Sequence, residues 1–114
     1  MRDLLHPLDL YRLIDRQLEQ IERASGRIFN VGGGREVSTS LCELTALCED
    51  VVGKSVPIEC DPETSAVDVP LYISDYAQAE AAFAWKPDRS MRAIVEDIAS
   101  WICANESTLK PILG

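Results

Sequence analysis

The chain has 114 residues, of which 46% are hydrophobic and 26% charged, and its formal net charge is −8. This length suits one domain that buries roughly two-thirds of its unfolded surface, and this composition excludes a disordered chain. The acidic charge argues against nucleic-acid and anionic-membrane partners, because both need clustered Lys and Arg.

The first predicted element is an amphipathic helix over residues 9 to 24. Apolar side chains recur there at helical spacing, Asp9 is a suitable N-cap, and Ser25-Gly26 supplies an end. The next segment, "RIFNV" at 27–31, predicts a short strand. We expect it to be buried on both faces, because its apolar and polar side chains barely alternate.

Three consecutive glycines, Gly32 to Gly34, follow this strand and precede a second helix. Ser40 and Glu43 have the spacing of a capping box, and Gly53 is placed to end the helix that it opens. This helix has one apolar face, formed by Leu41, Leu44, Leu47, Cys48 and Val51.

The second half of the chain predicts shorter elements. "SVPIEC" at 55–60 is compatible with an edge strand, 61–70 with a loop and "LYIS" at 71–74 with a short strand. Two capped helices follow, one after Asp75 over about 76–84 and one after Ser90 to about 105. The last helix carries an apolar stripe of Ile94, Ile98, Trp101 and Ile102.

These elements predict a helix-rich α/β chain with about four helices and a few short strands. Neither an internal repeat nor a low-complexity segment interrupts them, and the pattern indicates no second domain.

The triple glycine looks like a nucleotide-binding turn, but its spacing fails both phosphate-loop templates. If Gly32 and Gly34 start a G-x-G-x-x-G fingerprint, Val37 occupies the third glycine position. No Lys-Ser or Lys-Thr follows the glycines at the phosphate-loop spacing. Five residues also separate Gly34 from the cap at Ser40, so no helix N-terminus directly follows the turn. We therefore interpret the glycines as a structural turn.

No catalytic set of residues is recognisable. The short-chain dehydrogenase pair is a Tyr with a Lys four residues later, whereas Tyr11, Tyr72 and Tyr76 are followed there by Asp15, Tyr76 and Glu80. There is no G-x-S-x-G motif, and no Ser or Cys lies near the single histidine, His6, in the sequence. The sequence therefore names no catalytic residue.

The four cysteines, Cys42, Cys48, Cys60 and Cys103, lack C-x-x-C spacing, and His6 lies far from them in sequence, so we expect no metal site. We interpret the cysteines as small buried hydrophobic side chains in a reducing compartment. No apolar window approaches the ~18 residues of a membrane span, and "MRDLLHPLDL" has acids where a signal peptide has an apolar run. A cytoplasmic protein is expected.

Four motifs occur in order along the chain: "RDLLHPLDL", "IFNVGGG" with "SLCEL", "DVPLYISD" and "FAWKP". Together they resemble the C-terminal part of the extended short-chain dehydrogenases/reductases, which are NAD-dependent nucleotide-sugar epimerases and dehydratases. The set is most similar to the CDP-paratose (CDP-tyvelose) 2-epimerase branch. In such enzymes the N-terminal Rossmann part binds NAD and supplies the Tyr-Lys pair.

The resemblance implies that residues 1–114 are a single C-terminal substrate-binding portion, without the N-terminal NAD-binding domain. We therefore expect a chain that is not catalytic alone and holds no cofactor, although NAD is expected for the intact family enzyme. The alternative is a truncated or decayed, non-enzymatic fragment that acts as an association module. Whether the chain counts as an enzyme is left open.

Three candidate substrate-binding residues follow from the resemblance. Arg2 matches the arginine that contacts the diphosphate, Asp68 an aspartate near the nucleotide, and Tyr72 a tyrosine that borders the sugar pocket. Each also has a structural interpretation: a solvated terminal charge, a turn aspartate and a core tyrosine, respectively.

Two kinds of partner are expected. One is a CDP- or UDP-hexose, bound weakly because of the net charge of −8. The other is a second copy of the chain. In relatives the first helix and the "IFNV" strand are expected to pack on the nucleotide domain, so here they would expose an apolar face and a sheet edge that favour a homo-oligomer.

One departure from the family pattern generates a prediction. Ser65 stands where relatives have the arginine of R-x-x-D, so a charge-assisted contact is missing. Ser65→Arg should tighten CDP-glucose binding about ten- to a hundredfold, equivalent to about 1.5–3 kcal/mol, measured by titration calorimetry. An unchanged affinity would mean that residue 65 does not face the nucleotide.

Overall fold

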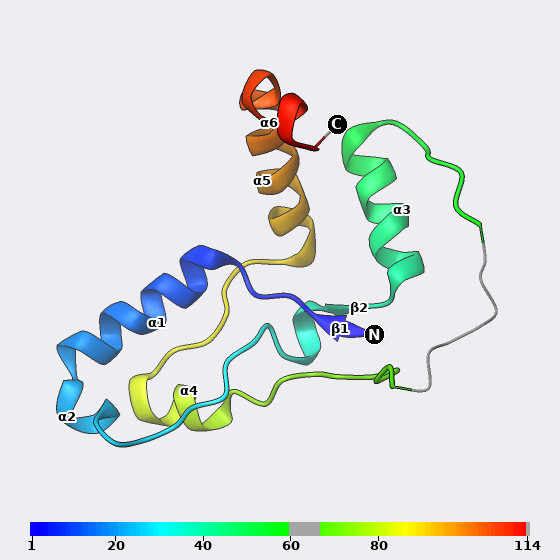
Figure 1. The fold of residues 1–114 in the computed structure, drawn as a ribbon. Coiled ribbons are helices and arrows are strands. Elements are labelled where there is room, and N and C mark those ends of the chain that lie inside the picture. The colour runs from blue at the N-terminus through cyan, green and yellow to red at the C-terminus, as the bar shows by residue number, and fades with distance from the viewer. Residues whose placement is uncertain (60–66, 114) are drawn as a thin grey trace.

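The computed structural model describes residues 1–59 and 67–113 (Figure 1). Within them the helix-rich α/β class is confirmed, with six α-helices and one two-stranded sheet. In chain order the elements are β1 Arg2–Asp3, α1 Pro7–Glu19, α2 Ile21–Ala24, a 3-10 turn Arg35–Val37, β2 Ser38–Thr39, α3 Leu41–Val52, α4 Ala77–Phe83, α5 Met91–Ala104 and α6 Glu106–Leu113.

The first helix begins two residues earlier than predicted, and its cap is not Asp9. His6 is the N-cap: its Nδ1 accepts the N–H of Leu8 at 3.1 Å, and Pro7 occupies the first helical position, where no N–H is needed. The predicted helix is also two helices, because Gln20 leaves the helical conformation at φ −120° and ψ 41° between α1 and α2.

Asp9 instead lies buried in the first turn of α1, with 1% of its surface exposed. Its carboxylate accepts the backbone N–H groups of Asp88 and Arg89 at 3.3 and 3.1 Å and pairs with the Arg89 guanidinium at 2.9 Å. Its backbone carbonyl accepts the indole N–H of Trp85 at 2.9 Å. One residue of α1 thereby fixes the segment that connects α4 to α5.

The hydrophobic core is small and lies between α1 and α4. It consists of Leu13 from α1, Ala79 and Phe83 from α4, and Trp85. Arg16 closes the end of α4 by donating to the carbonyls of Phe83 and Ala84.

The predicted strand at 27–31 does not form a ladder. Its side chains alternate, because Phe29 and Val31 pack against the core cluster while Ile28 and Asn30 are exposed. None of the backbone groups of residues 28–31 is hydrogen-bonded to a described residue. The expectation of burial on both faces is therefore wrong.

The capping predictions for α3 and α5 are confirmed. Ser40 and Glu43 form a capping box at α3, Gly53 ends that helix in the left-handed conformation, and the Ser90 hydroxyl accepts the Ala93 N–H at the start of α5. At α4 the N-cap is Tyr76, although Asp75 accepts the N–H of Ala77 at 2.9 Å.

Other predictions need correction. Of the stripe expected on α5 only Ile94 is buried, while Ile98, Trp101 and Ile102 are exposed. Residues 55–59 form no strand, and "LYIS" contributes a single bridge at Tyr72. The short helix α6 was not predicted; Pro111 lies inside it.

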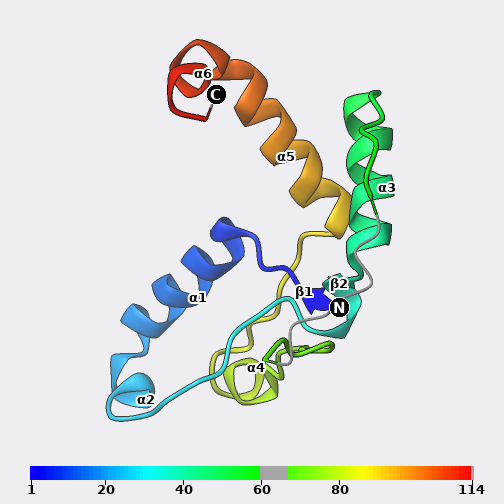
Figure 2. The same cartoon turned by 45° about the vertical axis from the view of Figure 1, so that its right-hand side comes forward.

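The molecule is open for its size. Its radius of gyration is 17.2 Å, whereas a compact chain of 114 residues has about 13 Å. Its accessible surface is 8774 Å², compared with about 6,200 Å² for a compact monomer of 12.6 kDa. In both ribbon views α3 and the α5–α6 arm project away from the α1–α4 core (Figures 1 and 2). Across residues 1–59 and 67–113, no helix is long and apolar enough to cross a membrane.

The Asp9 network generates a stability prediction. Asp9→Asn removes one partner of a buried ion pair and should lower the free energy of unfolding by about 3 kcal/mol, measured by urea denaturation followed by circular dichroism. Asp15→Asn is the matched control, because Asp15 lies exposed on the same helix and its side chain makes no hydrogen bond or ion pair to a described residue. It should change the stability by less than about 0.5 kcal/mol. Equal losses in the two variants would contradict the role of Asp9.

Candidate functional site

The structure brings together the three residues that the family resemblance selected. Arg2 lies in β1, which pairs antiparallel with β2 so that Arg2 faces Thr39 and Asp3 faces Ser38. On the other side of β1, Arg2 forms a parallel bridge with Tyr72, and the Tyr72 N–H donates to the Met1 carbonyl at 3.1 Å. The start of the chain therefore joins segments that are about 40 and 70 residues away.

Asp68 completes this group by pairing with the guanidinium of Arg2. The Arg2 Nη2 lies 3.1 Å from the Asp68 Oδ1, and the Arg2 Nη1 donates to the Met1 carbonyl at 2.9 Å. Both side chains of the pair are about half exposed, at 46% and 52%. Arg2 is thus not merely a solvated terminal charge, and its guanidinium is held on the surface beside a carboxylate.

Tyr72 is 59% exposed. The alternative interpretation, in which its ring belongs to the hydrophobic core, is therefore wrong. The ring stays available to a ligand next to Arg2, although the contact of each of these three residues with a nucleotide sugar is still a prediction.

Asp3, which the sequence analysis did not select, fixes the neighbourhood of Arg2. Its Oδ2 accepts the Gly34 N–H at 3.0 Å, and it also bonds Ser74. Burial raises the pKa of Asp3, but the hydrogen bonds from Gly34 and Ser74 together outweigh it and hold the pKa below its usual value. The signal was its place in the R-D motif beside Arg2.

The close approach of β1 explains the triple glycine. A Cβ at Gly33 would overlap the backbone carbonyl of Leu4, and Gly34 has φ +68° with the Tyr76 ring against it. A larger residue would therefore collide with the backbone just after β1 at Gly33 and with the Tyr76 ring at Gly34. The interpretation as a structural turn is confirmed.

The cavity that Arg2 lines is small, at about 60 Å³, and its other walls come from β2 and the start of α3. This is room for a few water molecules at most. A nucleotide sugar therefore does not fit into the cavity that Arg2 lines, and at Arg2 it could only lie against the open surface.

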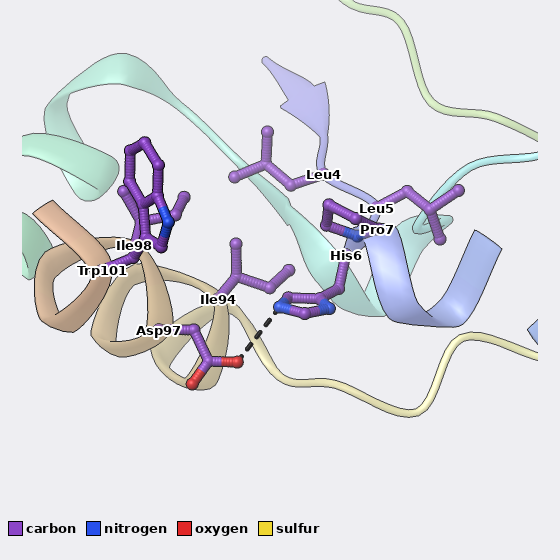
Figure 3. Close-up of a pocket in the computed structure, with 8 residues that line it drawn as sticks. All are labelled: Leu4, Leu5, His6, Pro7, Ile94, Asp97, Ile98 and Trp101. Atoms are coloured by element: carbon purple, nitrogen blue, oxygen red, sulfur yellow. Dashed lines mark ion pairs between the residues drawn. The ribbon is translucent and has the colours of Figure 1, made fainter. Parts of the chain in front are cut away.

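A larger hollow of about 570 Å³ lies between residues 4–7 and α5, and Arg2 does not line it (Figure 3). Its walls are mainly apolar, with Ile94, Ile98 and Trp101 on the α5 side. Its two polar side chains are paired with each other, because the His6 Nε2 lies 3.1 Å from the Asp97 carboxylate. The His6 Nδ1 is also engaged as the helix cap, so both ring nitrogens of His6 are occupied, and the Trp101 indole N–H and the second Asp97 oxygen are the polar groups that remain in the lining.

Metal and thiol chemistry find no further support. No cluster of His, Cys, Asp and Glu that could hold a metal occurs among the described residues. Cys42 and Cys103 are exposed and Cys48 is half-buried, all three as free thiols, so the expectation of buried cysteines is wrong for Cys42 and Cys103. Cys60 and Ser65 lie outside the described residues.

The known proteins that match this chain belong to one class, the nucleotide-sugar epimerases. No family model matches the chain. A UDP-glucose 4-epimerase of Corynebacterium glutamicum is 33% identical over 98 residues, or 85% of this chain. A CDP-paratose 2-epimerase of Salmonella typhi is 29% identical over 89% of it, and the UDP-glucose 4-epimerase 4 of Oryza sativa subsp. japonica 28% identical over 92%.

The chain covers less than a third of each of these relatives, between 28% and 30% of their length. Because all three relatives are epimerases and match most of this chain, they confirm its resemblance to the C-terminal part of the nucleotide-sugar epimerases.

The lowered pKa of Asp3 predicts acid sensitivity. Because its pKa is lower in the folded state than in the unfolded state, Asp3 stabilises the fold above the ordinary aspartate value of about 4, and this contribution disappears as the pH falls through the folded-state pKa. Asp3→Asn should therefore lose less stability than the wild type between pH 5 and pH 2, measured by urea denaturation at each pH.

Asp15→Asn is again the control, and its free energy of unfolding should fall with decreasing pH as steeply as that of the wild type. Glu43 and Glu49 also have lowered pKa values, through hydrogen bonds from Ser40 and from Ser55 and Val56, so only the difference from the wild type reports on Asp3. If the free energy of unfolding depended on pH in the same way for Asp3→Asn and the wild type, the role of Asp3 would be contradicted.

Proposed function

We propose that this chain is the nucleotide-sugar-binding, C-terminal portion of an NAD-dependent epimerase or dehydratase, and that it is not catalytic alone. The observation that supports the proposal most is the meeting of Arg2, Asp68 and Tyr72 at one edge of β1. Arg2 belongs to one family motif and Asp68 and Tyr72 to another that is about 66 residues away, so their proximity favours a shared role. In this proposal Arg2 binds the diphosphate, Asp68 lies near the nucleotide and Tyr72 borders the sugar.

The state of the Arg2 guanidinium suits anion binding. Its partner carboxylate is about half exposed, and an exposed ion pair of this kind is worth only about 0–1 kcal/mol. A diphosphate offers the guanidinium stronger, bidentate hydrogen bonds and can replace Asp68. The net charge of −8 works against a second anion, so the binding proposed here is weak.

An NAD-dependent epimerase reaction would require residues that this sequence of 114 residues does not contain. Neither a Tyr-Lys pair at the dehydrogenase spacing nor a NAD-binding glycine turn occurs in the sequence. We propose that NAD and the catalytic pair belong to the portion of the relatives that this chain does not match, which exceeds two-thirds of their length. The three free thiols in the described residues favour a reducing compartment, and we propose the cytoplasm.

The test is titration calorimetry with CDP, UDP and their glucose conjugates. The wild type should bind at least one of them, and Arg2→Gln should lose at least about tenfold in affinity, because a charge-assisted contact is worth about 1.5–3 kcal/mol. The same mixtures with NAD should show no change in nicotinamide absorbance.

Arg92→Gln is the matched control, since Arg92 is also an exposed arginine paired with an aspartate, Asp50, at 2.6 Å. It should bind like the wild type. Equal loss in both variants, or no binding by the wild type, would overturn the proposed site.

The alternative function is a non-enzymatic association module. The open shape favours it, because the accessible surface exceeds that of a compact monomer of this mass by roughly 2,500 Å². If calorimetry detected no binding of the nucleotides or their glucose conjugates while the chain formed a stable oligomer, this alternative would be supported.

A further inference from the structure

The ring of His6, the single histidine of the sequence, lies between two helices (Figure 3). Its Nδ1 accepts the Leu8 N–H at 3.1 Å at the start of α1, and its Nε2 lies 3.1 Å from the Asp97 carboxylate of α5. The side chain is nine-tenths buried, with 10% of its surface exposed. Both ring nitrogens therefore have a protein partner, one on each helix.

These two partners determine where the neutral ring carries its proton. A backbone N–H can only donate, so Nδ1 presents its lone pair to Leu8. The single proton of the neutral imidazole is then on Nε2, where it faces the negative carboxylate of Asp97. In this tautomer each nitrogen meets a group of opposite hydrogen-bonding character, and the ring serves α1 and α5 at once.

The Leu8 N–H depends on the ring because the first N–H groups of a helix have no acceptor within the helix itself. Pro7 has no N–H, so that of Leu8 is the first donor of α1. The next two donors, at Asp9 and Leu10, both bond the backbone carbonyl of His6. Among the described residues, the Nδ1 lone pair is therefore the side-chain acceptor that caps α1.

A second proton converts this acceptor into a donor. Imidazole is the side chain that ordinarily changes its charge between about pH 5 and 8, and in His6 the nitrogen that takes the added proton is Nδ1. Two N–H groups then face each other at the start of α1, and neither can accept from the other. On the opposite side of the ring, a positive imidazolium still faces the carboxylate of Asp97. Protonation thus keeps the contact with α5 and ends the contact with α1.

The other charged side chains on the elements around His6 already have partners of their own. They form the pairs Asp9–Arg89, Arg12–Asp88, Arg92–Asp50 and Arg92–Glu96, and Asp3 accepts the Gly34 N–H. Among the described residues, the titratable side chains that line the hollow are His6 and Asp97. The carboxylate that faces the ring is therefore that of Asp97.

We propose that His6 is a pH-sensitive cap of α1, which holds the Leu8 N–H while the ring is neutral and releases it on protonation, the pair with Asp97 being kept. Residues 4–7 connect β1 to α1, so the release occurs next to the strand that holds Arg2. The proposal uses no contact of Arg2 and needs no nucleotide, and it therefore succeeds or fails independently of the proposed function.

The test is nuclear magnetic resonance of the ¹⁵N-labelled chain at about pH 8 and about pH 5.5, on either side of the ordinary imidazole range. A single histidine gives unambiguous ring signals. The ring should carry its proton on Nε2 at the higher pH and both protons at the lower pH. The protection of the Leu8 N–H against hydrogen exchange should fall about fivefold, which is the loss expected for one N-cap.

His6→Asn is the matched variant, because an asparagine side chain accepts the Leu8 N–H but does not titrate. Its protection at Leu8 should be equal at the two pH values. The Ala93 N–H is the internal control, since the Ser90 hydroxyl that caps it keeps its charge, and its protection should stay constant in both proteins.

A neutral ring that carries its proton on Nδ1 overturns the proposal. Equal protection of the wild-type Leu8 N–H at both pH values also overturns it, and so does a pH dependence at Leu8 that persists in His6→Asn.

Discussion

The buried carboxylate of Asp9 is the interaction on which the arrangement of the helices depends. It lies on α1, yet its hydrogen bonds reach Asp88 and Arg89, about 80 residues along the chain. With the indole of Trp85 bonded to its carbonyl, Asp9 sets where the chain leaves α4 and therefore where α5 begins. The cluster of four buried core residues between α1 and α4 contains no residue of α5, so Asp9 supplies a polar link from that core to the start of α5.

Asp3 has the corresponding role at the other end of the molecule. It joins β1 to the glycine turn and to Ser74, while the backbone of Arg2 bonds on both sides of the strand. The candidate site is therefore a surface where three chain segments meet, and not an enclosed pocket. This explains why Arg2, Asp68 and Tyr72 are adjacent but do not enclose a ligand.

The features that sequence predicted well are local. The capping box at Ser40 and the cap at Ser90 form within four residues, and the glycine turn needs only its own backbone and a close neighbour. The failures involve distant partners. The apolar period of α1 could not reveal that Asp9 would bind residues 88 and 89, and an apolar strand pattern at 27–31 could not supply the neighbouring strand that a ladder requires. For the site, family motifs selected its residues, but the ion pair and the exposure of Tyr72 required coordinates.

The pairing of Arg2 with Asp68 has a consequence for the chain itself. The two residues are 66 positions apart, and their contact ties the first strand to the segment before Tyr72. Asp68 therefore acts as an internal competitor for any anion that seeks the guanidinium. By linkage, an anion that takes Arg2 releases this tether, and whatever holds Asp68 elsewhere makes Arg2 more receptive. Occupancy of Arg2 by an anion and the ion pair with Asp68 would therefore exclude each other, while the hydrogen bonds of Met1 to Pro70 and Tyr72 still join the two segments.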